Sequence, residues 1–277
     1  VWLKRQIDPQ AASRVRKLNL PGIGLLTESR RFYPKRTLAG ALLGFVGVDG
    51  KGLEGVEFQF DSYLRGRKRT IVVVRDAAGR RLRMLDTEQS EPPRGYDIVL
   101  TLDEAIQTAA ERELARQVRH SNASSGTILV LDSQNGAILA MAQEPPFNPN
   151  DFENANPNTW RNRAITDSYE PGSTFKVVMA TAALELGRAN PTDLFFAEGG
   201  AYRVGGIVIH DHKPYRWLSF AQVLQKSSNI GAVKIAQLVG RKGFSTVMRR
   251  FGFGELSGVD LAGEAPGLLR PLKEWSS

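Results

Sequence analysis

Two adjacent prolines, Pro92 and Pro93, divide the sequence into a shorter first part and a longer second part. Proline has no backbone N–H to donate and favours extended backbone, so neither residue fits inside a helix or a central strand. We interpret the surrounding string, Glu91-Pro92-Pro93-Arg94-Gly95, as a linker. The sequence therefore predicts two domains, residues 1–95 and residues 96–277.

The first part favours short strands and loops. Its runs Ile71–Arg75 and Arg80–Leu85 flank a polar spacer, Asp76–Gly79, and this pattern is typical of a β-hairpin. Glycines are frequent in residues 40–55, which favours turns over regular elements. We therefore expect a β-rich first domain.

Positive charge is concentrated in the same part. Residues 1–95 contain 19 Lys and Arg against 10 Asp and Glu, whereas the remainder contains 18 against 19. Such asymmetry is compatible with a nucleic-acid partner, a nearby anionic membrane or a solvated basic face. The densest basic stretch, residues 65–69, lacks the interleaved aromatic rings that stack on bases, so the nucleic-acid interpretation is the poorest of the three.

A helix followed by a hairpin opens the second part. Thr101-Leu102-Asp103-Glu104 predicts a capping box, and apolar residues then recur at helical spacing as far as His120. Thr127–Asp132 and Ala137–Ala142 are apolar runs joined by a spacer that ends in Asn-Gly, a strong signal for a two-residue hairpin turn. Helices beside antiparallel strands predict an α+β fold.

Three further helices are predicted downstream. They cover Gly172–Gly187, Ser219–Gln225 and Ile230–Val239. The first ends in a glycine, which is typical of a C-terminal cap. The other two are separated by a short polar break, Lys226-Ser227-Ser228-Asn229.

Ser173 and Lys176 are the first candidates for chemistry. They are three residues apart at the start of a predicted helix, and this spacing places both side chains on one face. A serine hydroxyl needs a base within hydrogen-bond reach, and a lysine with a lowered pKa can serve. The alternative is an N-cap serine beside an exposed lysine.

The break at residues 227–229 supplies a second candidate element. Ser227 could pass a proton between Lys176 and a leaving nitrogen, while Asn229 could bind a substrate amide and the lysine amine. Serine and asparagine are also favoured helix caps, so the triplet alone leaves a purely structural interpretation open.

Together these strings resemble class B penicillin-binding proteins, the monofunctional peptidoglycan transpeptidases, especially the division type. The resemblance rests on Glu170-Pro171-Gly172-Ser173-Thr174-Phe175-Lys176 and Lys226-Ser227-Ser228-Asn229, and on Arg161-Asn162-Arg163-Ala164 before them. In the first part, Glu28-Ser29-Arg30-Arg31-Phe32-Tyr33-Pro34 and Gly52-Leu53-Glu54-Gly55-Val56-Glu57 resemble the non-catalytic pedestal domain of the same class.

The resemblance implies an α+β protein, with an extended β-rich pedestal before a transpeptidase domain of helices around a five-stranded antiparallel sheet. We expect residues 96–277 to be the N-terminal part of that domain and to lack several strands of its sheet. It implies that Ser173 forms an acyl-enzyme, that Lys176 deprotonates it, and that Ser227 and Asn229 assist. Further residues expected to contact the substrate are Glu170, Gly172, Thr174 and Ser228.

The resemblance also implies where such a protein works and with what. Its substrates are peptidoglycan stem peptides, and β-lactams acylate the same serine. Its expected partners are a division glycosyltransferase and other division membrane proteins, with no nucleic acid. Its expected place is the bacterial inner membrane, through a single-pass anchor, with the catalytic domain in the periplasm. No apolar run of the chain approaches the roughly 18 to 20 residues needed to span a bilayer, so we expect that anchor to lie outside it.

One part of the family pattern is missing. The third motif, Lys-Thr-Gly or Lys-Ser-Gly, does not occur, and the nearest string is Arg241-Lys242-Gly243. The motif is expected beyond Ser277, together with an oxyanion N–H and the groups that hold the substrate carboxylate. Losing one oxyanion donor typically costs about 10² to 10³ in rate, so we expect residues 1–277 alone to acylate poorly or not at all.

Other features favour structure over chemistry. His210-Asp211-His212 suggests a metal site, but neighbouring glycines and Pro214 favour a loop, and two adjacent ligands do not suffice. Phe195, Phe196 and Trp217 are more typical of a core or cleft wall than of a binding box. The absence of cysteine excludes disulfides and cysteine nucleophiles. We expect no metal and no cofactor.

Two other functions stay open at this point. A serine β-lactamase or D,D-carboxypeptidase would use the same serine and lysine but pass the acyl group to water. A non-catalytic division scaffold would keep the fold and recruit other proteins. The long pedestal-like first part argues against the hydrolases.

Overall fold

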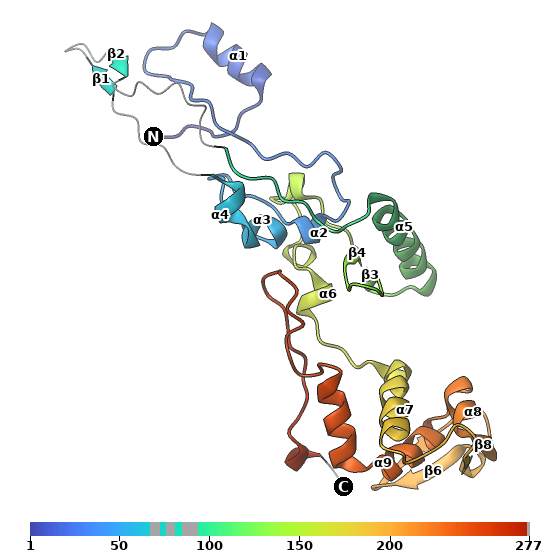
Figure 1. Cartoon of the computed structure of the whole chain (residues 1–277). Helices are drawn as coiled ribbons and strands as arrows, with labels where there is room; N and C mark the ends of the chain where they lie inside the picture. The colour runs from blue at the N-terminus through green and yellow to red at the C-terminus, as the bar shows by residue number, and fades with distance from the viewer. Residues whose placement is uncertain (67–72, 76–80, 85–93, 276–277) are drawn as a thin grey trace. The chain divides into compact units, whose positions relative to one another are not determined.

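The computed structural model describes residues 1–66, 73–75, 81–84 and 94–275 (Figure 1). The chain forms two compact units. The first contains Val1–Thr166 with Asp260–Gly263, and the second contains Asp167–Val259 with Glu264–Ser277. The linker predicted at residues 91–95 lies largely outside the described residues, and the domain limits 1–95 and 96–277 stay a prediction.

Short helices open the first unit. They are α1 (Pro9–Lys17), α2 (Gly40–Leu43), α3 (Gly55–Gln59) and α4 (Asp61–Leu64). The predicted hairpin is confirmed where the structure describes it, because β1 (Val73–Arg75) pairs antiparallel with β2 (Arg81–Met84). Its spacer, residues 76–79, lies outside the described residues. The described part of residues 1–95 thus has more helical turns and less strand than the sequence predicted, because Leu42 and Val56 of α2 and α3 are buried in a shared apolar cluster.

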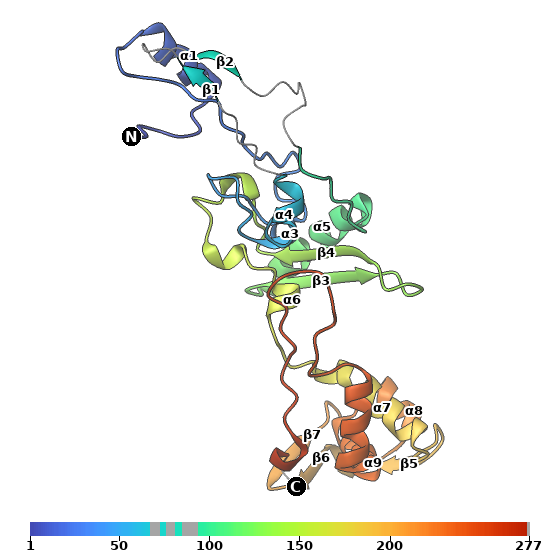
Figure 2. The same ribbon diagram turned by 60° about the vertical axis from the view of Figure 1, so that its left-hand side comes forward.

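The predicted helix and hairpin of the first unit are confirmed (Figure 2). They are α5 (Glu104–Ser121), β3 (Gly126–Leu131) and β4 (Ile138–Glu144), followed by α6 (Arg163–Thr166). Ala110 and Leu114 of α5 pack against Ala140 and Ala142 of β4, so the helix covers one face of the hairpin. One face of β4 therefore packs against α5, while Met141 on its other face is buried in the cluster that contains Leu42 and Val56.

Two local details of this region differ from prediction. The N-cap of α5 is Asp103, whose side chain accepts the backbone N–H of Ile106 at 2.9 Å, whereas the Thr101 hydroxyl donates to Ile138 O. The hairpin loop is the whole predicted spacer, residues 133–136, and not a two-residue turn, because Asp132 N still bonds Ala137 O at 2.9 Å. Gly136 there has a φ of +76°, which suits a residue without Cβ.

A buried polar network lies within the first unit. The Glu57 side chain is 10% exposed, and its carboxylate accepts hydrogen bonds from the Arg31 guanidinium and, at 3.2 Å, from the Tyr33 hydroxyl. The side chain of Asn150 accepts the backbone N–H of Tyr33 and donates to its carbonyl. The two segments that resemble the pedestal domain, residues 28–34 and 52–57, are thus connected by hydrogen bonds between their charged and aromatic side chains.

The second unit contains the remaining predicted helices. Its elements are α7 (Lys176–Glu185), β5 (Leu194–Phe196), β6 (Ala201–Val204), β7 (Ile207–His210), β8 (Trp217–Ser219), α8 (Phe220–Gln225) and α9 (Asn229–Arg250). Strand β5 pairs antiparallel with β8, and β6 pairs antiparallel with β7. The α+β class is confirmed. Within the described residues the strands form two-stranded sheets, and residues 96–277 were expected to hold only part of the five-stranded sheet.

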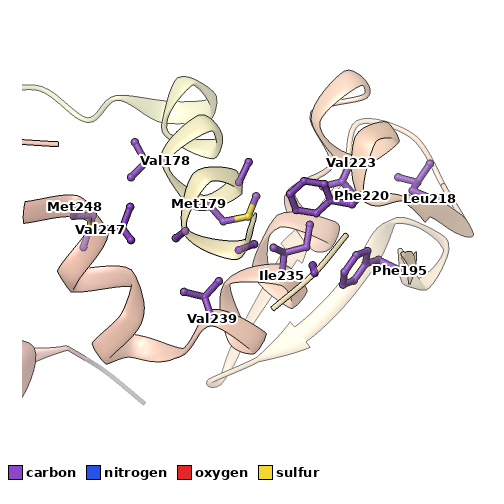
Figure 3. Close-up of a cluster of buried hydrophobic side chains, with 14 of the residues drawn as sticks. Val178, Met179, Phe195, Leu218, Phe220, Val223, Ile235, Val239, Val247 and Met248 are labelled. Carbon is purple, nitrogen blue, oxygen red and sulfur yellow. The ribbon is translucent and has the colours of Figure 1, made fainter. Parts of the chain in front are cut away.

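The core of the second unit joins α7, α8 and α9 (Figure 3). Met179 of α7, Val223 of α8 and Ile235 of α9 are all at most 3% exposed. Burying side chains of this size stabilises a fold by about 1.5 to 3 kcal/mol each. The first turns of α7 and α9, which carry the candidate residues, are therefore attached to one packed core.

The helix predicted over residues 230–239 is confirmed as the first segment of α9, which begins at Asn229. The helical backbone breaks at Gly240, where φ is +74°, and a second helical segment that was not predicted extends to Arg250. Helical structure resumes because Val247 and Met248 are buried in the core. None of the helices in the described residues combines the length and apolar composition needed to cross a lipid bilayer.

Candidate active site

Ser173 lies in a single 3₁₀ turn, Gly172–Phe175, that leads directly into α7. Gly172 has a φ of +59°, and no atom lies within 4 Å of the place where a Cβ would project. Glycine is therefore needed at position 172 because of the positive φ, and not because a side chain would clash with a neighbour. Phe175 holds the turn in place, because its ring lies 5.8 Å from that of Phe244 and 5.0 Å from that of Phe253. Ser173 itself is exposed.

Lys176 is the first residue of α7, three residues after Ser173. Its Nζ lies 3.2 Å from Ser173 Oγ, as the predicted helical spacing requires. The lysine is only partly exposed. The structure thus brings the predicted nucleophile and its predicted base into hydrogen-bond contact.

The loop between α8 and α9 brings Ser227 to the same amine. Lys176 Nζ lies 2.7 Å from the carbonyl oxygen of Ser227 and 3.0 Å from its Oγ. The backbone of Ser227 is in the left-handed region, with φ at +53°, and in this conformation both its carbonyl oxygen and its hydroxyl contact the amine. A left-handed conformation costs a residue with a Cβ roughly 1 to 2 kcal/mol, so the core on either side holds this loop in place.

Asn229 completes the surroundings of the amine. Its Nδ2 donates to the carbonyl oxygen of His210 at 2.9 Å, which fixes the orientation of the side-chain amide. Oδ1 consequently points to Lys176 and lies 2.8 Å from Nζ.

These contacts can be made by a neutral amine. The Ser227 carbonyl and Asn229 Oδ1 can only accept hydrogen bonds, and a neutral lysine has two N–H groups to give them. Its lone pair is then free for a hydroxyl proton. Burial lowers the pKa of Lys176 below its ordinary value, and the charge of Asp211 offsets part of that lowering.

The other predicted site residues differ in exposure: three of them are exposed and one is buried. Glu170, Gly172 and Thr174 are exposed beside Ser173, and the Thr174 hydroxyl donates to the carbonyl of Pro171. Ser228 was expected to contact substrate, but it is 1% exposed. Its hydroxyl accepts the backbone N–H of Gly231 at 2.9 Å and donates to Asp211 at 2.6 Å, a placement that favours a structural role.

Asp211 was not predicted as part of this site. Its two neighbouring histidines suggested only a metal ligand, and the described residues contain no cluster that could hold a metal ion. Asp211 instead contacts the residues 228–230. No spacing rule connects positions seventeen residues apart across a strand end and a helix, so no local signal could have found it.

The aromatic residues noted earlier lie on both sides of β5. Phe195 is 8% exposed and belongs to the core of the second unit. Phe196 and Trp217 face each other with ring centres 5.1 Å apart, and Trp217 is exposed.

Comparison with known proteins identifies the family. Residues 126–277 match the family model of the penicillin-binding protein transpeptidase domain, and residues 1–100 match that of the penicillin-binding protein dimerisation domain. The chain belongs to the penicillin-binding protein transpeptidase family. The predicted class B type, in which a pedestal precedes the transpeptidase domain, is confirmed by the two matches together.

The penicillin-binding protein relatives are named as transpeptidases. Peptidoglycan D,D-transpeptidase FtsI of Escherichia coli K12 is 37% identical over 276 residues, which are 100% of this chain and 46% of the relative. Probable peptidoglycan D,D-transpeptidase PenA of Neisseria meningitidis is 36% identical, over 99% of this chain and 47% of the relative. The chain therefore spans about half the length of the curated relatives that it matches.

Solved penicillin-binding proteins share the fold. Penicillin-binding protein 3 of Mycobacterium tuberculosis is 31% identical, with a TM-score of 0.74, over 89% of this chain and 52% of that one. That protein has been solved in complexes with aztreonam and with ampicillin. A peptidoglycan synthetase of Bifidobacterium adolescentis is 30% identical, with a TM-score of 0.75, over 99% of this chain and 50% of that one.

Proposed function

We propose that this protein is a peptidoglycan D,D-transpeptidase that cross-links stem peptides through an acyl-enzyme on Ser173 during septal cell-wall synthesis. The observation that carries the proposal is the position of Lys176 Nζ, within hydrogen-bond distance of Ser173 Oγ, Ser227 Oγ and Asn229 Oδ1. Membership of the penicillin-binding protein transpeptidase family supports it.

In the acylation step, the neutral amine of Lys176 takes the proton of the Ser173 hydroxyl as Oγ attacks the carbonyl carbon of the penultimate D-Ala. The tetrahedral intermediate then collapses, and the C–N bond to the terminal D-Ala breaks. Ser227 passes the proton from the lysine to the leaving nitrogen. A base at this distance typically contributes about 10² to 10⁴ in rate.

In the transfer step, the amine of a second stem peptide attacks the Ser173 ester. The Lys176 amine takes a proton from the attacking nitrogen, and the C–O bond to Ser173 breaks as Oγ is protonated again. The products are the cross-linked peptide and the free enzyme. A β-lactam acylates the same hydroxyl by opening its ring, so its leaving nitrogen stays attached and its ester persists.

The remaining site residues receive more limited roles. Glu170, Gly172 and Thr174 lie exposed beside Ser173, where we propose that they border the bound stem peptide. Ser228 is assigned to holding the loop, since both of its hydrogen-bonding capacities are used within the chain.

The wider setting is also part of the proposal. We assign residues 1–95 to a pedestal domain and residues 96–277 to the transpeptidase domain. The substrates are peptidoglycan stem peptides, and the partners are a division glycosyltransferase and other division membrane proteins. We place the protein at the bacterial inner membrane, single-pass anchored, with its catalytic domain in the periplasm. The relatives' names as peptidoglycan D,D-transpeptidases support the substrate class, and the two family matches, over residues 1–100 and 126–277, support the domain assignment.

Labelling with a fluorescent penicillin tests the chemistry. The protein as its host cell makes it is incubated with the penicillin, and the modified peptide is located by mass spectrometry. Ser173 should carry the adduct, and Ser173→Ala should remove it. Ser168→Ala, at an exposed serine five residues earlier, is the matched control and should label normally. Labelling that survives Ser173→Ala would overturn the proposal.

Two measurements separate this function from its alternatives. A β-lactamase would release the penicilloyl group within minutes, whereas a transpeptidase should hold it for hours. A non-catalytic scaffold would still support division with Ser173→Ala in place of the wild-type gene, and a transpeptidase should not.

A further inference from the structure

The carboxylate of Asp211 receives three hydrogen bonds at the start of α9. Oδ2 accepts the Ser228 hydroxyl at 2.6 Å, and Oδ1 accepts the backbone N–H groups of Asn229 and Ile230, the latter at 3.1 Å. Both carboxylate oxygens are therefore committed to one short loop.

These bonds satisfy the beginning of the helix. The first N–H groups of any α-helix lack partners within the helix and need acceptors from elsewhere. In α9, Asp211 accepts the first two, and the Ser228 hydroxyl accepts that of Gly231 at 2.9 Å. Because Ser228 also donates to Asp211, the cap of α9 depends on the carboxylate both directly and through Ser228. A negative charge at a helix N-terminus is also favoured electrostatically.

The residue before Asp211 acts on the same loop. The carbonyl of His210, the last residue of β7, accepts Asn229 Nδ2 at 2.9 Å. The pair His210-Asp211 thus holds both the backbone and the side-chain amide of Asn229. This arrangement turns Oδ1 of Asn229 toward Lys176.

The carboxylate also acts on Lys176 through its charge. Its field favours the protonated amine, against the larger effect of burial. The titratable side chains beside Asp211 in the chain, His210, His212 and Lys213, are all exposed, and so is Lys226, which precedes the loop that Asp211 contacts. Solvent screens such groups more strongly than the partly buried Lys176.

We propose that Asp211 is a positioning residue for the acylation of Ser173, which fixes the Ser227–Asn229 loop against Lys176. Its carboxylate does not touch the substrate. The carboxylate holds the loop through its bonds to residues 228–230. The Ser227 carbonyl and Asn229 Oδ1 can then accept the two N–H groups of the amine, which leaves its lone pair for the Ser173 hydroxyl. This inference rests on the proposed transpeptidase function of the same site.

The test compares Asp211→Asn and Asp211→Ala with the unaltered protein, each made in its host cell. The second-order rate of Ser173 acylation by a fluorescent penicillin is measured from neutral to alkaline pH, and unfolding temperature is measured in parallel. Asp193→Asn is the matched control, since the Asp193 carboxylate also accepts a backbone N–H in this unit, that of Asn190, at 2.7 Å, but away from the loop.

We expect Asp211→Ala to slow acylation by about 10- to 100-fold, because three charge-assisted hydrogen bonds to the loop are lost. Asp211→Asn keeps the shape and loses the charge, so acylation should fall less. Its pH profile should also move, since removing the negative charge lowers the pKa of Lys176 further and shifts the acidic limb to lower pH. Asp193→Asn should leave both rate and limb unchanged.

The outcomes distinguish this inference from the proposed function. If the unaltered protein carries no adduct on Ser173, the proposed function fails. If the unaltered protein is acylated and folded Asp211→Asn matches it in both rate and acidic limb, the positioning role is wrong while the function stands. Should Asp211→Ala fail to fold, the isosteric Asp211→Asn decides the question.

Discussion

Oδ1 of Asn229 lies 2.8 Å from Nζ of Lys176, although the two residues come from different helices. The contact depends on the amide orientation that His210 fixes from a third segment. The base is therefore held by the tertiary fold and not only by the helix on which it lies.

Replacing Lys176 by Arg should remove the base but keep a positive charge. A guanidinium stays protonated at any working pH and offers no lone pair, so acylation of Ser173 should fall by about 10² to 10⁴. The measurement is the rate of penicillin labelling. Lys226→Arg, at an exposed lysine before the loop, should label at the normal rate. A labelling rate within about twofold of normal for Lys176→Arg would contradict the assigned role.

Asn229→Asp should shift the pH dependence of acylation upward. A carboxylate at this position stabilises the ammonium form of Lys176 and raises its pKa, whereas burial lowers it in the unaltered site. Because attack needs the neutral amine, the acidic limb of the rate profile should move to higher pH. Gln237→Glu, an exposed substitution of the same charge type later in α9, serves as control. An unmoved limb for Asn229→Asp would argue against a neutral lysine.

Ser228→Ala should destabilise the second unit. The hydroxyl is buried, caps α9 and donates to Asp211, so its removal leaves two partners unsatisfied. Losses of this kind typically cost about 1 to 3 kcal/mol of unfolding free energy. Thermal or denaturant unfolding measures the change. Ser168→Ala, at an exposed position, should change stability by no more than about 0.5 kcal/mol. If the two variants unfold alike, the cap is not needed.

Glu57→Ala should destabilise the first unit. It leaves the Tyr33 hydroxyl and the Arg31 guanidinium without their shared carboxylate. Since Arg31 is partly exposed, we expect a loss of about 2 kcal/mol, below the value for a fully buried pair. Lys35→Ala breaks the exposed pair with Glu104 and should cost less than about 1 kcal/mol. Denaturant unfolding compares the two variants, and equal losses would contradict the prediction.

The sequence predicted best where contacts are local. Ser173 and Lys176 are three residues apart, and helical geometry alone brings them together. The hairpin of β3 and β4 and the start of α8 were likewise predicted from alternation and turn residues close in the chain. In each case the interacting groups lie within one element or a pair of neighbouring elements.

Prediction was weakest where one choice depends on distant packing. Thr101 and Asp103 are both acceptable caps for α5, and the competing bond from Thr101 to Ile138 decides between them. The helical segment after Gly240 was not predicted, and it is held by Val247 and Met248, which are buried in the core. Asp211 is close to residues 228–230 only in the folded chain, so the local sequence pattern does not predict its contacts.

The left-handed backbone of Ser227 makes the stability of this loop and its catalytic role compete for the choice of residue. A glycine there would relax the peptide but would delete the hydroxyl that lies 3.0 Å from the Lys176 amine and that we propose passes the proton to the leaving nitrogen. The loop thus keeps a residue with a side chain at a position where glycine would give a more stable fold. Selection for thermal stability alone would favour glycine at position 227 and would lower the rate of acylation.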